Sequence, residues 1–169
     1  MTGPTPPSSP NPPALPEWWA TTASALDTKM GFEVTELTPA RVVGSMPVEG
    51  NTQPYGLWHG GASCVLAETL ASIGSFAHAQ TVSPGSAAVG VDLNATHHRP
   101  ARTGRVTGVA TALHLGRRTT SYEVVLSDDD GRRVCTARVT CQVVPGEPRD
   151  AAGGGMGRPV AGSRPDASA

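Results

Sequence analysis

The sequence predicts an α+β fold in which a curved antiparallel sheet wraps around one long central helix. A segment at residues 60–79 is apolar or small-sided over nearly its whole length, as a buried helix would be. Two candidate strands precede it and four follow it, some alternating with a period of two. So apolar a helix must be buried, and six strands supply enough sheet to cover it. The simplest arrangement therefore wraps the sheet around the helix.

The first expected element is a short helix over residues 16–30. Pro16 suits the first turn of a helix, and Gly31 suits the position just past its end. Trp18 and Trp19 are expected to pack against the rest of the domain rather than to take part in function.

Two strands follow, at residues 32–37 and 40–48, joined around Thr38 and Pro39. A loop over residues 49–58 leads into the long helix. Six residues of that helix follow helical spacing: Val65, Leu66, Thr69, Leu70, Ile73 and Ala77. The remaining positions are mostly Ala and Ser, so other backbones can approach this helix closely.

The second half of the chain is expected to hold four strands. Their approximate ranges are 86–98, 103–115, 118–128 and 132–144. The run Asp128-Asp129-Asp130-Gly131 is a strong hairpin-turn signal between the last two. Sheet edges left unpaired in this arrangement favour pairing with a second subunit.

The chain has 169 residues, and its composition indicates one domain over residues 16–144. The flanking segments, 1–15 and 145–169, are rich in Pro, Gly and Ala and are expected to be disordered. Net charge is −1, so no bulk attraction to nucleic acid or to a membrane surface is expected. The apolar runs are far shorter than the roughly 20 residues of a membrane helix, and no secretory signal is expected.

Three cysteines, an odd number, argue against a disulfide framework. Cys135 and Cys141 fall on one face of a predicted strand about 20 Å apart, too far to bridge. Reduced thiols indicate a cytoplasmic protein. No spacing typical of a zinc site occurs, so we expect neither a metal nor a resident cofactor.

Residues 53–72, QPYGLWHGGASCVLAETLAS, carry most of the functional signal. The pair Gly60-Gly61 opens the long helix, where unpaired N–H groups and the positive end of the helix dipole suit a developing negative charge. Glu68 lies two turns inside, where a lone carboxylate is costly to bury without a partner or a role. A polarising helix end together with a placed carboxylate is the equipment for acyl transfer.

This stretch resembles the hotdog-fold acyl-CoA thioesterases, together with VDLNATHHRPARTGRV at 91–106 and LHLGRR at 113–118. The nearest types are the phenylacetate-pathway (PaaI-like) enzymes, the 4-hydroxybenzoyl-CoA thioesterases with a helical Glu, and the 1,4-dihydroxy-2-naphthoyl-CoA hydrolases. The resemblance spans about residues 30–144. It implies a double-hotdog homodimer, often paired into a homotetramer, with sites at the dimer interface.

The resemblance also implies roles for particular residues. Glu68 corresponds to the catalytic carboxylate, and Gly60 to the backbone donor to the thioester carbonyl. Gln53 and His59 match residues that place the carbonyl and the attacking group, and Ser72 matches a hydroxyl that helps to hold water. The positions that fall where the family contacts coenzyme A, as part of the substrate, are His97, Arg99, His114, Gly116, Arg117 and Arg118.

Two departures from the family pattern stand out. Trp58 is bulkier than the expected aliphatic residue and reshapes the acyl pocket in this interpretation. His98 beside His97 is also unexpected, and neighbouring strand residues point to opposite faces, so at most one of the two should reach a given ligand.

Geometry independently favours a site shared by two subunits. Gly60 and Glu68 are eight residues apart, about 12 Å along a helix, whereas both must reach one carbonyl group. Two antiparallel helices side by side would bring the start of one near the carboxylate of the other. Five arginines between Arg99 and Arg118 supply charge for the phosphates of coenzyme A, although strand-end arginines also serve solubility.

The leading hypothesis is hydrolysis of an acyl-CoA thioester, with an aromatic or medium-chain acyl group, to a free acid and coenzyme A. Glu68 acts either as a nucleophile or as a general base. The alternative is a non-catalytic acyl-CoA-binding hotdog module, and a hotdog dehydratase ranks last. The sequence leaves the natural acyl group and the choice between dimer and tetramer open.

Overall fold

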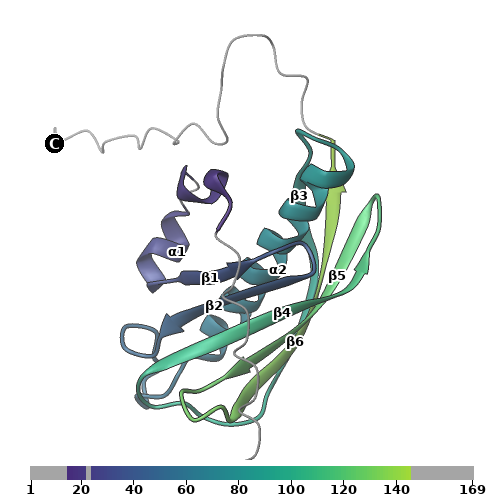
Figure 1. Ribbon diagram of the computed structural model, residues 1–169. Helices are drawn as coiled ribbons and strands as arrows, with labels where there is room; N and C mark the ends of the chain where they lie inside the picture. Colours follow the sequence, from purple (N-terminus) through teal and green to yellow (C-terminus); the bar gives the residue numbers. More distant parts are fainter. Residues whose placement is uncertain (1–14, 22–23, 146–169) are drawn as a thin grey trace, which may run out of the picture.

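The computed structural model describes residues 15–21 and 24–145 (Figure 1). The expected disordered tails, 1–15 and 145–169, lie almost entirely outside the described residues. The expected domain, 16–144, lies within them apart from residues 22 and 23.

Six strands form one antiparallel sheet in the spatial order β1-β2-β4-β5-β6-β3. Their bounds are β1 Glu33–Leu37, β2 Arg41–Pro47, β3 Ala87–His97, β4 Arg105–Leu115, β5 Thr119–Ser127 and β6 Arg133–Val144. Each begins and ends within two residues of the predicted range. The hairpin turn between β5 and β6 is also confirmed, since Asp128 and Arg132 are hydrogen-bonded and Gly131 has φ 74°.

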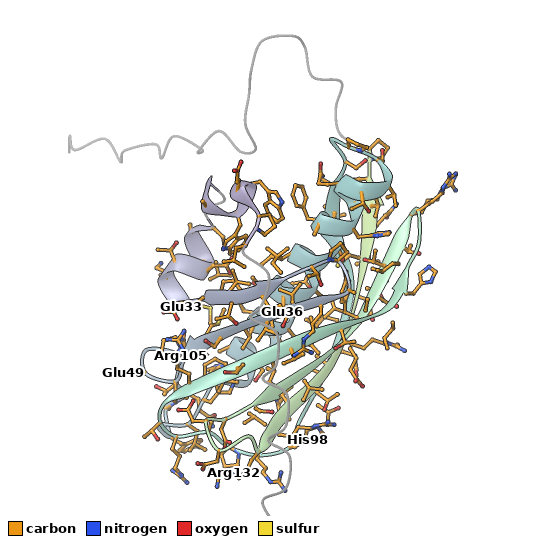
Figure 2. The ribbon with its side chains drawn as sticks, in the orientation of Figure 1. Glu33, Glu36, Glu49, His98, Arg105 and Arg132 are labelled. Carbon is orange, nitrogen blue, oxygen red and sulfur yellow. The ribbon has the colours of Figure 1, made fainter. Side chains whose placement is uncertain are left out.

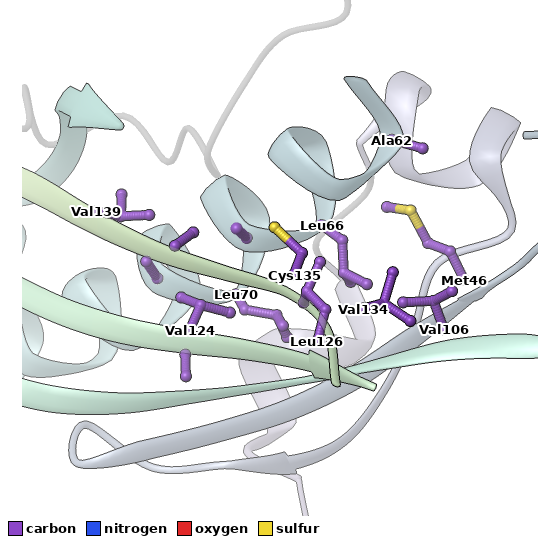
Figure 3. Close-up of a cluster of buried hydrophobic side chains, with 14 of the residues drawn as sticks. Met46, Ala62, Leu66, Leu70, Val106, Val124, Leu126, Val134, Cys135 and Val139 are labelled. Carbon is purple, nitrogen blue, oxygen red and sulfur yellow. The ribbon is translucent and has the colours of Figure 1, made fainter. Parts of the chain in front are cut away.

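The long helix, α2, runs from Gly60 to Val82, and the sheet curves around it (Figure 1). Leu66 and Leu70 of α2 are fully buried against the sheet. Figure 3 shows them beside Val124 and Leu126 of β5. Burying each of these side chains stabilises the fold by about 1.5–3 kcal/mol. The α+β prediction of a central helix wrapped by an antiparallel sheet is confirmed.

The small residues of α2 allow the helix to lie close to the sheet. A Cβ added at Gly74 would stand 2.9 Å from the hydroxyl oxygen of Tyr122, a fully buried residue of β5. The Tyr122 hydroxyl donates to the carbonyl of Pro39 at 2.7 Å, which satisfies its buried polar group. Close approach therefore fixes the distance between helix and sheet.

The prediction of one helix over residues 16–30 is wrong. The segment holds a 3₁₀ helix, Glu17–Thr21, and a separate helix α1, Ala25–Met30. The Ser24 side chain caps α1 by accepting the Asp27 N–H at 3.2 Å. This cap favours a new helix start at Ala25 over one continuous helix from residue 16. Gly31 ends α1 in the left-handed conformation, as predicted.

The two tryptophans of this segment pack against the domain. Trp18 meets Phe76 of α2 edge-on, with ring centroids 5.0 Å apart. Trp19 meets Phe32 in the same way at 6.3 Å. The predicted packing role is confirmed. The Phe76 ring is in contact with Trp18 of the N-terminal segment.

Strands β1 and β3 are the two edges of the sheet. On β3, Val89 and Val91 are 47% and 63% exposed. Among the described residues the three cysteines are free, and no helix is long and apolar enough to cross a membrane.

Candidate active site

The start of α2 leaves one backbone donor available. His59 is the N-cap, and its Nδ1 accepts the Gly61 N–H at 2.8 Å. The His59 carbonyl accepts the N–H groups of Ala62 and Ser63 at 2.9 and 3.2 Å. The Gly60 N–H has no acceptor among the described residues, so it is the open donor at the positive end of the helix dipole.

Gly60 also borders a cavity of about 430 Å³. The lining residues are Gln53, Leu57, Trp58, Gly60, His97, His98, Arg99, Pro100 and Val134. A Cβ added at Gly60 would stand 2.9 Å from Nε2 of His97, so a larger residue here would have to displace this imidazole. Gln53, Gly60, His97 and Arg99, four of the predicted site residues, therefore meet at one cavity.

Trp58 fixes the loop that leads into the helix. Its side chain is buried, and Nε1–H donates to Oγ of Ser63 in the first turn of α2 at 2.7 Å. Its backbone N–H donates to the carbonyl of Ala101 at 2.8 Å. Trp58 thus ties the loop both to the helix and to the segment after β3, in addition to lining the cavity.

Glu68 lies two turns inside α2 and is half-buried. Its Oε1 accepts the Ser72 hydroxyl at 3.2 Å, which places both predicted residues together one turn apart. The carboxyl group rests against the backbone of Gly90 on β3, where an added Cβ would stand 2.9 Å from its Cδ atom.

Gly90 is a site residue that the sequence reasoning missed. It sits at a register irregularity of β3 between Gly90 and Asp92, next to the Glu68 carboxylate. A glycine inside a strand often marks a bulge or a close approach, and this signal could have found it.

A single protomer does not unite the two halves of the predicted site. Gly60 and Glu68 lie at opposite ends of a stretch that spans about 12 Å along the continuous helix α2. The open amide and its cavity form one half, and the Glu68–Ser72 pair forms the other.

The adjacent histidines contact different residues, but both line the cavity beside Gly60, so the expectation that at most one of them reaches a given ligand stays a prediction. His97 packs against Gly60. Nε2 of His98 lies 3.0 Å from the hydroxyl of Thr136 on the neighbouring strand β6. In Figure 2, His98 lies at the end of the sheet near the β5–β6 turn, where Arg132 is also labelled.

The other predicted coenzyme A contacts lie at the opposite end of the sheet. Strand register aligns His97 with Cys135, Cys135 with Leu126, and Leu126 with Gly108. The remaining predicted contacts follow Gly108 by six to ten residues, at the end of β4 and in the connection to β5. They are His114, Gly116, Arg117 and Arg118. One protomer therefore does not bring them to the cavity beside Gly60.

Two of the five arginines noted in the sequence have other surroundings. Arg105 donates to Oγ of Ser45 at 2.9 Å and pairs with Glu33 at 3.1 Å, so it joins the ends of β1, β2 and β4 (Figure 2). Arg102 borders a separate surface cavity together with Asp129 and Asp130. Arg105 is thus a structural arginine.

A curved sheet around a helix, an open amide at the helix start and a carboxylate further along it define a hotdog-fold protein equipped for acyl transfer. The model of the thioesterase superfamily matches residues 55–135. The proofreading thioesterase EntH of Klebsiella pneumoniae is 44% identical over 126 residues, covering 74% of this chain and 90% of the relative.

Solved structures agree. A mutant of thioesterase PA1618 from Pseudomonas aeruginosa is 41% identical with a TM-score of 0.71, covering 79% of this chain and 95% of that one. Thioesterase HI1161 from Haemophilus influenzae is 30% identical with a TM-score of 0.69, covering 75% and 87%. The chain belongs to the thioesterase superfamily, and it is a thioester hydrolase.

Proposed function

We propose that the protein hydrolyses an acyl-CoA thioester with an aromatic or medium-chain acyl group, giving a free acid and coenzyme A. The observation that carries this proposal is the Gly60 N–H, which lacks an acceptor among the described residues and borders a cavity. No resident cofactor or metal is needed, because thioester hydrolysis requires only a stabilised oxygen and a delivered nucleophile.

In this mechanism the Gly60 N–H donates to the thioester carbonyl oxygen and stabilises the negative charge that develops there. Removing one such donor typically raises the barrier by about 3–4 kcal/mol. Gln53 lines the same cavity and helps to place the carbonyl. His59 holds the helix start in shape through Nδ1, which leaves its other ring nitrogen available toward the ligand.

Glu68 supplies the nucleophile in one of two ways. It attacks the carbonyl carbon and forms a mixed anhydride that water then cleaves, or it takes a proton from the attacking water. In either route the Ser72 hydroxyl, 3.2 Å from Oε1, holds the carboxylate and helps to place water.

The two halves meet across a homodimer in this proposal. Gln53, His59 and Gly60 come from one protomer, and Glu68 and Ser72 come from its partner. The exposed valines of edge strand β3 and the exposed position of Gly90 beside Glu68 support an interface at this edge. A homotetramer of two such dimers follows the family pattern.

Coenzyme A would then bind across the same interface. His97 and Arg99 stand at the cavity, whereas His114, Gly116, Arg117 and Arg118 lie at the far end of the sheet. Both groups can serve one extended ligand only if they come from different protomers. The free thiols support a reducing, cytoplasmic setting for this chemistry.

The test is thiol release from a panel of acyl-CoAs by the native protein and by Glu68→Gln. We expect Glu68→Gln to lose at least about a hundredfold in kcat. The matched control is Glu49→Gln, which changes an exposed carboxylate outside the site. Equal rates for native protein and Glu68→Gln would reject Glu68 as the acting group, and saturable binding without turnover would favour a binding module.

A further inference from the structure

Three residues of α2 face three positions of the sheet in one row. The pairs are Glu68 with Gly90, Ser72 with Cys141, and Ser75 with Thr120. Cys141 is the middle sheet position, since the register pairs it with Gly90 of β3 on one side and with Thr120 of β5 on the other. In this row the Ser72 hydroxyl contacts both the Glu68 carboxylate and the buried Cys141 thiol.

The direction of the hydrogen bonds in this row follows from the number of protons. Ser72 has one hydroxyl proton, and it is donated to Oε1 of Glu68 at 3.2 Å. The Ser72 oxygen lies 3.9 Å from Sγ of Cys141, and either atom could donate by geometry alone. Because the Ser72 proton is already used, a hydrogen bond between these two atoms has the Cys141 thiol as donor and the Ser72 oxygen as acceptor.

The environment keeps that thiol protonated. Cys141 is fully buried, and burial raises the pKa of its thiol above the ordinary value, an effect that hydrogen bonds of neighbouring hydroxyls offset only in part. At neutral pH the side chain therefore carries the proton that it needs as a donor.

We infer that Cys141 is a positioning residue, which orients the Ser72 hydroxyl toward Glu68 by donating its thiol proton to the Ser72 oxygen. The inference rests on the proposed function, because Cys141 touches no substrate and acts only through Ser72 and Glu68. Without this donor the Ser72 hydroxyl is free to rotate away from the carboxylate. The Glu68 carboxylate then loses part of its fixed orientation, while the binding surface for the substrate is unchanged.

The experiment compares Cys141→Ala with Cys141→Ser, two variants of similar size that differ in one hydroxyl. We expect Cys141→Ala to lower kcat about three- to tenfold with KM unchanged, the scale of one net hydrogen bond. Cys141→Ser restores a donor and is expected to stay within about twofold of native kcat. If Cys141→Ala does not fold, Cys141→Val replaces it, since it fills the space without a donor.

Cys135→Ala is the matched control, because Cys135 is an equally buried cysteine on the same strand, six residues before Cys141. It is expected to keep native kcat. The same Cys141→Ala change is then made in a Ser72→Ala background, where it should cause no further loss. A merely structural role of Cys141 would lower activity in both backgrounds alike.

Three results would each overturn the inference. They are a native kcat in Cys141→Ala, a loss of kcat in Cys135→Ala equal to that in Cys141→Ala, and a Cys141→Ala loss that adds to the Ser72→Ala loss in the double variant. The Glu68→Gln measurement separates this failure from that of the proposed function. If Glu68→Gln is inactive while Cys141→Ala has native kcat, only the positioning role is wrong. If Glu68→Gln has the native rate, the proposed function itself fails.

Discussion

The contact between Glu68 and Gly90 gives the sharpest prediction. In Gly90→Ala the new Cβ would stand 2.9 Å from the carboxyl carbon, with Oε1 nearer still, whereas ordinary contact begins at 3.4 Å. The carboxylate must therefore withdraw by at least about half an ångström. Misplacing a reacting group by about 1 Å can cost about a hundredfold in rate, so we expect kcat to fall about 10- to 100-fold.

The folded state should tolerate this change, because the displaced group is the end of a flexible, half-buried side chain. The matched control is Gly108→Ala, another strand glycine that faces α2, where the new Cβ meets Leu70 and stands 2.8 Å from Cδ2 of Leu126. Overpacking a core typically costs about 1–3 kcal/mol, so this variant should lose stability.

The assay is acyl-CoA hydrolysis followed by thiol release, with thermal melts of both variants. Gly90→Ala is expected to melt near the native temperature with low kcat, and Gly108→Ala to melt lower with kcat close to native at permissive temperature. Native kcat in a correctly folded Gly90→Ala protein would refute the assigned geometry of Glu68.

Three further predictions follow from buried groups. Trp58→Phe removes the bond to Ser63 and should lower stability by about 1–3 kcal/mol, measured by urea unfolding. Burial raises the pKa of Tyr122 far above its usual value, so above about pH 10 the unfolded chain releases a proton that the native protein keeps. The free energy of unfolding should thus fall as pH rises there, with a smaller slope in Tyr122→Phe. Burial also raises the pKa of the Cys135 and Cys141 thiols, so iodoacetamide should modify them only after unfolding, as mass spectrometry of native and urea-treated protein would report.

The sequence was sufficient to locate the strands because their signal is local. From Cys135 onward the side chains of β6 alternate between buried positions and partly or fully exposed ones, and the Asp-rich turn before β6 has a strong backbone preference. The boundary before α1 was missed because a cap at Ser24 competes with an otherwise helical composition.

The rotation of α2 about its axis could not be predicted. Small residues fill most positions between its larger apolar side chains, so helical spacing alone does not fix which face meets the sheet or where Glu68 points. The partners of Glu68 and Ser72 are Gly90 and Cys141, which lie in distant strands and meet the helix only through sheet register. Family resemblance supplied the roles, whereas the contacts required the three-dimensional structure.

The two halves of the site are held by different parts of the fold. The Gly60 amide is set by a loop that Trp58 and His59 fasten to the first turn of α2. The Glu68 carboxylate is set by the core, since Leu66 and Leu70 on either side of it are fully buried against the sheet. A loop can shift without unfolding the domain, but the helix cannot move without disturbing the core packing. Loop substitutions should therefore alter how the carbonyl is held, whereas substitutions that displace the Glu68 carboxylate itself, such as Gly90→Ala, should alter the delivery of the nucleophile.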